Sequence, residues 1–259
     1  HFFSVGVLLP LLNLYFHGLG IGGAQLGLLN AAPRFATALA PPLLGAVADK
    51  FRSGREVLFA CNLLSVIFIL GMWGTRAFLP LLALIVLYAS AKGALLPIAE
   101  NACLRDLAER GGQYGRVRWW GSLGFIVAAL GAGWLVEKTS AGVIFPLVGA
   151  SGLALFWVIY LLPREEGGIQ SHFGGELAGL MKNRALLVFL GASILASVSA
   201  GPFLIFFSIH LWELGFSAGV IGLAWAVGVV SEIFFMFYAQ AIQRRFGLRA
   251  MIAAGIIGT

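Results

Sequence analysis

The sequence predicts an all-α integral membrane protein, and three observations support this fold class. Hydrophobic residues make up 60% of the chain and charged residues only 11%, whereas a soluble domain has about 25% charged residues. The apolar residues form continuous blocks of roughly 20, the number that a helix needs to cross a hydrocarbon core. Such blocks do not alternate as the strands of a barrel do, and only helices or closed barrels satisfy their backbone in lipid. The chain is therefore expected to be a multi-pass helical bundle.

The apolar blocks define eight expected transmembrane helices and the start of a ninth at Ala250. The expected spans are residues 2–17, 25–48, 56–75, 78–104, 115–136, 142–162, 185–212 and 217–242.

The positive charges follow the expected membrane topology. Thirteen of the 17 basic residues lie around the loops after the second, fourth, sixth and eighth spans. The positive-inside rule places these loops in the cytoplasm, so the first helix runs from inside to outside. The net charge of +6 therefore reflects insertion into a membrane, and we expect a lipid bilayer rather than nucleic acid as the partner. A bacterial inner membrane is the expected location.

The chain repeats itself at an offset of 195 residues. This shift superposes Leu19, Gly20, Gly27, Leu28 and Ala31 on Leu214, Gly215, Gly222, Leu223 and Ala226. Helices 7 and 8 thus repeat helices 1 and 2, as in the duplicated halves of many transporters. We expect a six-helix half over residues 1–162, a cytoplasmic linker over 163–184, and the start of a second half over 185–259. Because the chain begins inside its first helix, we infer a fragment of a twelve-helix protein.

Four charged residues lie inside expected spans, namely Arg34, Lys92, Glu100 and Glu232. A charge at the centre of a bilayer costs at least about 2.5 to 3.5 kcal/mol, so each one needs a partner or a water-filled cavity. Such residues indicate a pathway for a substrate, an ion or a proton.

Hairpin geometry predicts that Glu100 pairs with Arg118. The expected spans 78–104 and 115–136 run antiparallel around a glycine-containing turn. Glu100 and Arg118 are equidistant from this turn, so they should lie at similar depth. The aromatic residues Trp119 and Phe125 flank this site and can stack on a ring. The alternative is that the pair only fastens the hairpin at the cytoplasmic interface.

The remaining intramembrane charges leave several roles open. Glu232 has no basic residue within one turn, so it is a candidate proton carrier, or it pairs with a base elsewhere. Arg34 is assigned with Glu232 to proton coupling, because it can complement an anionic substrate or neutralise a core carboxylate. Lys92 either has a direct role or extends toward water. Cys61 and Cys103 lack metal-ligand spacing, so no metal or cofactor is expected.

Two stretches resemble a known family. Residues 45–55, GAVADKFRSGR, resemble the loop between helices 2 and 3 of the major facilitator superfamily. Residues 95–126, LLPIAENACLRDLAERGGQYGRVRWWGSLGFI, resemble its lactose permease-like and phenylpropionate permease-like branch. The resemblance implies a substrate-contacting pair of Glu100 and Arg118. It also implies a cytoplasmic gate at Gly45, Asp49, Lys50 and Arg55.

These features together predict a monomeric secondary transporter, not an enzyme, that carries a small organic solute by alternating access, with protons as the coupling ion. A sugar, a nucleoside and an aromatic acid are equally compatible with the sequence. A channel would need a repeated ring of polar residues, and a membrane enzyme would need clustered catalytic groups. A solute sensor descended from a transporter is the remaining alternative.

Overall fold

The computed structural model describes residues 1–51, 54–93, 95–110, 114–161 and 183–247. Within these ranges the chain is helical and contains no strand. The elements are α1 (Phe2–Gly18), α2 (Gly23–Phe51), α3 (Gly54–Trp73), α4 (Phe78–Gly93), α5 (Leu95–Arg110), α6 (Tyr114–Lys138), the 3-10 turn η1 (Ala141–Val143), α7 (Ile144–Leu161), α9 (Arg184–Glu213) and α10 (Ala218–Phe246).

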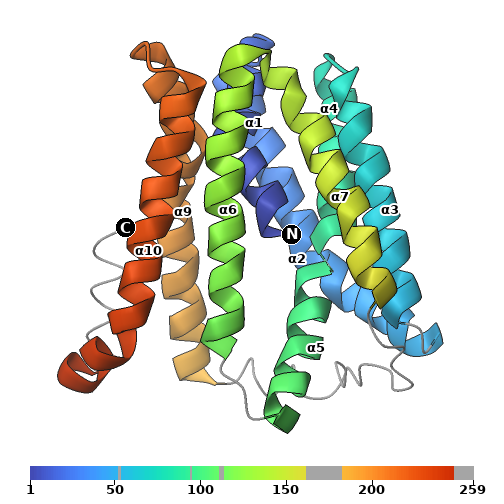
Figure 1. Ribbon diagram of the computed structural model, residues 1–259, viewed down its shortest axis with the longest axis vertical. Helices are drawn as coiled ribbons and strands as arrows, with labels where there is room; N and C mark the ends of the chain where they lie inside the picture. Colours follow the sequence, from blue (N-terminus) through green and yellow to red (C-terminus); the bar gives the residue numbers. More distant parts are fainter. Residues whose placement is uncertain (52–53, 94, 111–113, 162–182, 248–259) are drawn as a thin grey trace.

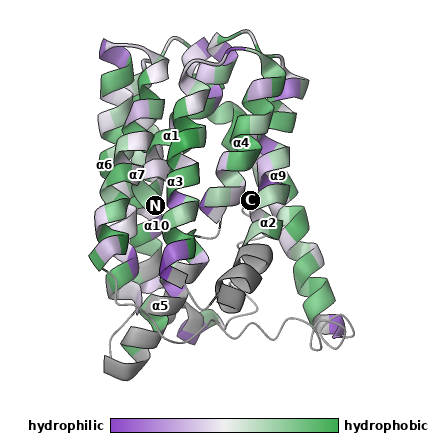
Figure 2. Cartoon of the chain, turned by 90° about the vertical axis from the view of Figure 1, so that its right-hand side faces the viewer, coloured by the Kyte–Doolittle hydropathy of each residue, from purple (hydrophilic) through white to green (hydrophobic). Residues whose placement is uncertain are grey.

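The predicted fold class is confirmed. Six of the described helices are long and apolar enough to cross a membrane, and α1 is a shorter apolar helix. Figure 2 shows apolar residues along most of the length of the bundle. The fourth expected span, 78–104, covers α4 and the first part of α5, which lie on either side of residue 94. The expected ninth helix, and the expected linker up to residue 182, lie outside the described residues.

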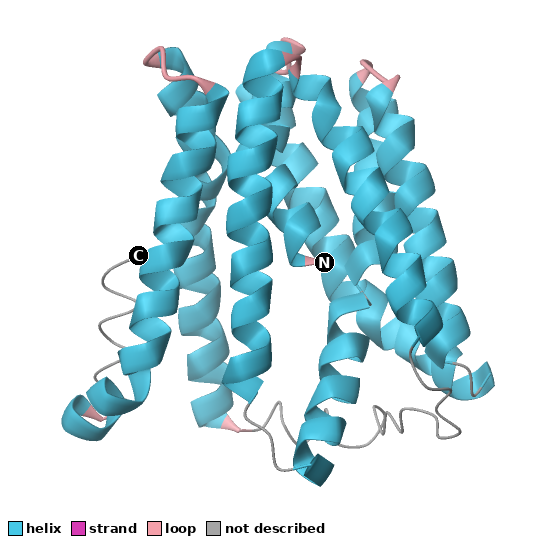
Figure 3. Cartoon of the chain, in the orientation of Figure 1, coloured by secondary structure: helices cyan, strands magenta, loops and turns pink. Residues whose placement is uncertain are grey.

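The connections α1–α2, α3–α4, α6–α7 and α9–α10 all lie at the upper end of the molecule in Figure 1, and Figure 3 shows them as short loops. Of the basic residues, only Arg76 and Lys138 belong to this end, whereas the basic loops belong to the opposite end. The positive-inside rule therefore makes the upper end the outer side of the membrane.

The predicted repeat has the same backbone geometry in both copies. Gly20 and Gly215, which are 195 residues apart, have φ angles of 78° and 87°. Each amide donates a 2.9 Å hydrogen bond to a carbonyl in the last turn of the preceding helix, from Gly20 to His17 and from Gly215 to Trp212. A positive φ is the conformation that glycine adopts without a steric penalty, which explains its presence at both helix ends. The bounds of α2 and α10 differ by the same 195 residues.

Helix α1 lies at the centre of the described bundle, where it packs against α6, α7 and α9. Its closest contact is made by Gly6, which lies against the backbone of Phe125 and the methyl group of Ala128 on α6. Small residues of this kind allow helices to approach closely in lipid, where association depends on packing and on hydrogen bonds between helices. One such bond joins α1 to α2, because the Asn30 amide donates to the Asn13 carbonyl oxygen over 2.8 Å.

The most extensive contact between two described helices joins α6 to α10 and therefore links the expected first half to the expected second half. A methyl group at Gly133 would lie 2.6 Å from the carbonyl oxygen of Ala218, and one at Gly222 would collide with the carbonyl oxygen of Ala129. The two backbones are therefore in direct contact near the outer side. Toward the lower end of Figure 1, α10 diverges from α6.

We predict that Gly222→Leu destabilises the protein, because the new side chain would force α10 away from the Ala129 carbonyl. Over-packing of this kind costs about 1 to 3 kcal/mol. The measurement is the apparent Tm of the detergent-solubilised protein. The matched control is Gly228→Leu on the same helix, where an added Cβ has no neighbour within 4 Å. Equal Tm values for the two variants would show that the contact does not support the fold.

Candidate functional site

The predicted partners Glu100 and Arg118 lie on α5 and α6, and each is engaged by another side chain. Glu100 accepts a 2.9 Å hydrogen bond at Oε1 from the hydroxyl of Tyr114, one turn before Arg118 on α6. The guanidinium carbon of Arg118 lies 4.1 Å from the ring centroid of Phe2 on α1, within the distance of a cation–π contact. Within the described part of the chain, Glu100 and Arg118 do not form an ion pair.

Both charges nevertheless act on the same group. Burial and then the hydrogen bond to Glu100 raise the pKa of Tyr114, whereas the positive charge of Arg118 opposes that change. The phenol therefore stays a donor to the carboxylate at neutral pH. Glu100, Tyr114, Arg118 and Phe2 form one group, which we call the α5–α6 cluster, and it links α1, α5 and α6.

The two aromatic residues predicted to flank this site have different surroundings. Trp119 is 39% exposed and packs against Trp120, with 4.8 Å between the ring centroids. Phe125 is 6% exposed and belongs to the main hydrophobic core, where its backbone meets Gly6 of α1. Trp119 is therefore partly exposed, whereas Phe125 packs the bundle.

Lys92 is far more buried than the sequence indicated. Its side chain is 7% exposed, and its Nζ donates a 3.1 Å hydrogen bond to the Ser4 hydroxyl of α1. The same Nζ lies 5.9 Å from the ring centroid of Tyr88, one turn earlier on α4. The side chain therefore points into the bundle. Extension toward water, one of the two alternatives for Lys92, is not what the structure shows.

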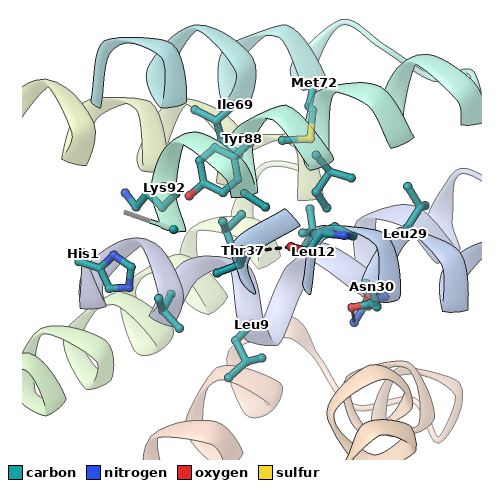
Figure 4. Close-up of a pocket in the computed structure, with 17 residues that line it drawn as sticks. His1, Leu9, Leu12, Leu29, Asn30, Thr37, Ile69, Met72, Tyr88 and Lys92 are labelled. Atoms are coloured by element: carbon teal, nitrogen blue, oxygen red, sulfur yellow. Dashed lines mark hydrogen bonds between the residues drawn. The ribbon is translucent and has the colours of Figure 1, made fainter. Parts of the chain in front are cut away.

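Lys92 also lines a cavity of about 360 Å³ between α1, α2, α3 and α4 (Figure 4). Most of its walls are apolar. Its polar lining residues are His1, Asn13, Asn30, Thr37, Tyr88 and Lys92. Cavities of at least about 300 Å³ with a few convergent polar groups are the usual form of small-molecule sites. Sequence reasoning missed this cavity, because its walls come from four helices that the pattern of spans does not orient.

The two residues proposed for proton coupling are not enclosed. Arg34 on α2 and Glu232 on α10 are both exposed, and among the described residues neither takes part in an ion pair. The described residues also contain no group of three or more His, Cys, Asp or Glu side chains placed to bind a metal ion.

The residues of the expected cytoplasmic gate lie around the end of α2 and the start of α3. Gly45, Asp49 and Lys50 belong to α2, but their side chains lie outside the described part of the structure. Arg55 on α3 donates a 2.7 Å hydrogen bond to the carbonyl oxygen of Tyr160 and lies 5.1 Å from its ring centroid. Arg55 thus fastens α3 to α7.

A second set of polar contacts, which the sequence did not indicate, joins the two halves at the outer side. Glu137 in the last turn of α6 accepts two hydrogen bonds at Oε2, one of 3.0 Å from the Ser217 hydroxyl and one of 3.2 Å from the Gly219 amide. The Gly219 amide is in the first turn of α10 and Ser217 directly precedes that helix. Free amides and the helix dipole favour a carboxylate at this position. We call this contact the outer latch.

Comparison with known proteins matches the whole chain to one family. The family model described as "MFS_1 like family" matches residues 1–259. The maltose permease of Geobacillus stearothermophilus is 32% identical, over 99% of this chain and 66% of that protein. The probable 3-phenylpropionic acid transporter of Escherichia coli is 27% identical, over 99% of this chain and 69% of that protein. This chain thus spans about two thirds of the length of such relatives.

A crystal structure of a mutant form of the nucleoside transporter NupG has a similar fold. The TM-score is 0.82 at 21% identity, and the similarity covers 95% of this chain and 66% of that one. A second NupG structure gives a TM-score of 0.70 over the same coverage.

We predict that Glu137→Ala loosens the outer latch, because it removes the acceptor of both bonds. At about 0.5 kcal/mol for each partly exposed bond, the two together are worth about 1 kcal/mol, so the population with separated outer ends should rise about fivefold. Spin labels at Lys138→Cys and Phe216→Cys, with Cys61 and Cys103 replaced by Ser, would report longer distances. Thr139→Ala is the control, since its hydroxyl bonds within α6 to Leu135. Unchanged distances in Glu137→Ala would rule out a latch.

Proposed function

Because the chain belongs to the MFS_1-like family, whose model matches all of its residues, we propose that the whole protein is a secondary active transporter for a small organic solute. The observation that carries this proposal is the position of the intramembrane charges relative to the contact between the halves. Arg118 lies fifteen residues before Gly133 on α6, or about 22 Å of helix rise on the inner side of that contact. Charged groups thus lie below a closed outer end.

Alternating access accounts for this arrangement. The halves are in contact at the outer side through Gly133, Gly222 and the outer latch, whereas α10 diverges from α6 toward the inner side (Figure 1). A solute would leave or enter from the cytoplasm in this state. Rocking of the halves would part the outer contact and bring the inner ends together, which is how duplicated transporters expose a fixed site to each side in turn.

In this proposal the α5–α6 cluster contacts the solute. Glu100 and Arg118 would hold polar groups of the solute through charge-assisted hydrogen bonds, which are strong where water is excluded. Their engagement with Tyr114 and Phe2 keeps both charges satisfied while the site is empty. Trp119 would stack on a ring, and Phe125 would support that face from the core.

Proton coupling and the inner gate are further parts of the proposal. Glu232 is a carboxyl group inside an apolar helix, which would carry a proton when a closed inner side shields it from water. Arg34 would compensate a negative charge in the same pathway. Gly45, Asp49, Lys50 and Arg55 would form the inner closure of the opposite state.

The proposal is tested by uptake into vesicles that contain the full-length protein, with maltose, a nucleoside and 3-phenylpropionate as solutes, with and without an imposed pH gradient. One solute should accumulate only with the gradient. Glu100→Gln should reduce its uptake by at least about tenfold, because a charge-assisted hydrogen bond is worth about 1.5 to 3 kcal/mol.

The control is Glu56→Gln, a matched change of an exposed carboxylate in the first turn of α3. It should leave uptake unchanged. Equal uptake by Glu100→Gln and the wild type would assign Glu100 to a structural role. Accumulation that ignores the pH gradient would remove protons as the coupling ion.

A further inference from the structure

The ammonium of Lys92 is a buried charge that the α5–α6 cluster does not use. Its side chain is 7% exposed, and its Nζ donates a hydrogen bond to the Ser4 hydroxyl over 3.1 Å. Among the described residues no carboxylate pairs with it. A lysine ammonium carries three donors and no acceptor, so a hydroxyl satisfies one donor without neutralising the charge. The site therefore retains an attraction for an anion.

The hydrogen bonds behind Lys92 have a defined direction. The Ser151 hydroxyl donates to the Val148 carbonyl oxygen over 2.7 Å. Because a hydroxyl has one proton, the 2.9 Å bond between the hydroxyls of Ser4 and Ser151 is donated by Ser4. Ser4 is then an acceptor for Lys92. The chain runs from α4 through α1 to α7 and ends on a carbonyl, so it fixes the position of the amine and does not relay a proton.

The cavity in front of Lys92 offers few other polar groups. Asn30 donates to Asn13 over 2.8 Å, and the Thr37 hydroxyl donates to the Pro33 carbonyl oxygen over 2.9 Å. Among the described lining residues, Lys92, the Tyr88 hydroxyl and the unpartnered Nδ1 of His1 remain for a ligand. Figure 4 shows the hydroxyl end of Tyr88 beside Lys92. The remaining walls are mostly apolar and include Leu9, Leu12, Ile69 and Met72.

These walls select the chemistry of the ligand. A sugar would bury several hydroxyl groups against leucine, isoleucine and methionine, and each hydroxyl without a partner would weaken binding. A molecule with one carboxylate and an apolar body leaves no such group unpaired. Its carboxylate would accept from Lys92 and Tyr88 in a charge-assisted hydrogen bond.

We propose that the cavity between α1, α2, α3 and α4 binds a small carboxylate with an apolar body, and that Lys92 is its anion-binding residue. The inference rests on the proposed transport function, because it names the class of solute that the transporter would carry. It specifies an organic monocarboxylate and not a sugar or a nucleoside.

The test is equilibrium binding to the purified full-length protein with two probes of the same shape, 3-phenylpropionate and the neutral 3-phenylpropionamide. The wild type should bind the carboxylate about 10- to 100-fold more tightly, the range expected for a hydrogen bond between charged groups. Lys92→Met should abolish this preference, and Lys92→Arg should keep part of it. Lys138→Met is the control, because Lys138 is exposed at the outer end of α6, and it should keep the full preference.

Equal affinity of the wild type for the two probes, binding of neither probe, or a preference that survives in Lys92→Met would each overturn the inference. Where Lys92→Met does not fold, Lys92→Arg decides the matter, because it should keep only part of the preference, whereas a preference due to Arg118 would be the same in Lys92→Arg and the wild type. Carboxylate binding through Lys92 without uptake would leave the inference standing and contradict transport. Gradient-driven uptake of maltose without carboxylate binding would support transport and overturn the inference.

Discussion

The arrangement of the described helices depends on the close contact between α6 and α10. In a bilayer the apolar surfaces of helices gain little from avoiding lipid, so association relies on backbone approach and on hydrogen bonds between helices. Gly133 and Gly222 allow the close approach of the two backbones, because neither position has room for a side chain. Glu137 provides hydrogen bonds between the helices by accepting from Ser217 and Gly219. Both features lie near the outer ends of the helices, so they hold the halves together at one side of the membrane.

Such a contact suits a transporter because the helix backbones pack closely, but only near the outer ends of α6 and α10. The carboxylate of Glu137 binds the start of α10 through one side-chain and one backbone donor, and neither is deeply buried. Contacts of this kind exchange readily for water. The charges farther inside differ, because Lys92 is enclosed and the α5–α6 cluster is partly enclosed. In the proposed transport cycle the outer contact would break while the charged groups keep their protein partners.

Much of the fold could be predicted from the sequence because a membrane leaves few choices. The length of the apolar blocks gave the helices, and the 195-residue offset located equivalent glycines in the turns at Gly20 and Gly215. The site was less predictable. Hairpin spacing fixes the depth of Glu100 and Arg118 but not the rotation of their helices, and Tyr114 and Phe2 are the partners observed. Lys92 and Glu137 depend on Ser4, Ser151 and Ser217, which are distant in sequence, so spacing carries no signal for them.

The central claim, that the halves must separate at the outer side for solute to cross, is tested most directly by a reversible cross-link. Glu137→Cys and Ser217→Cys, in full-length protein without Cys61 and Cys103, place two thiols where the native side chains are in contact. A short thiol-cleavable reagent that joins them should stop solute uptake, and reduction should restore it. Uptake that continues in the cross-linked protein at the rate of the reduced protein would contradict alternating access.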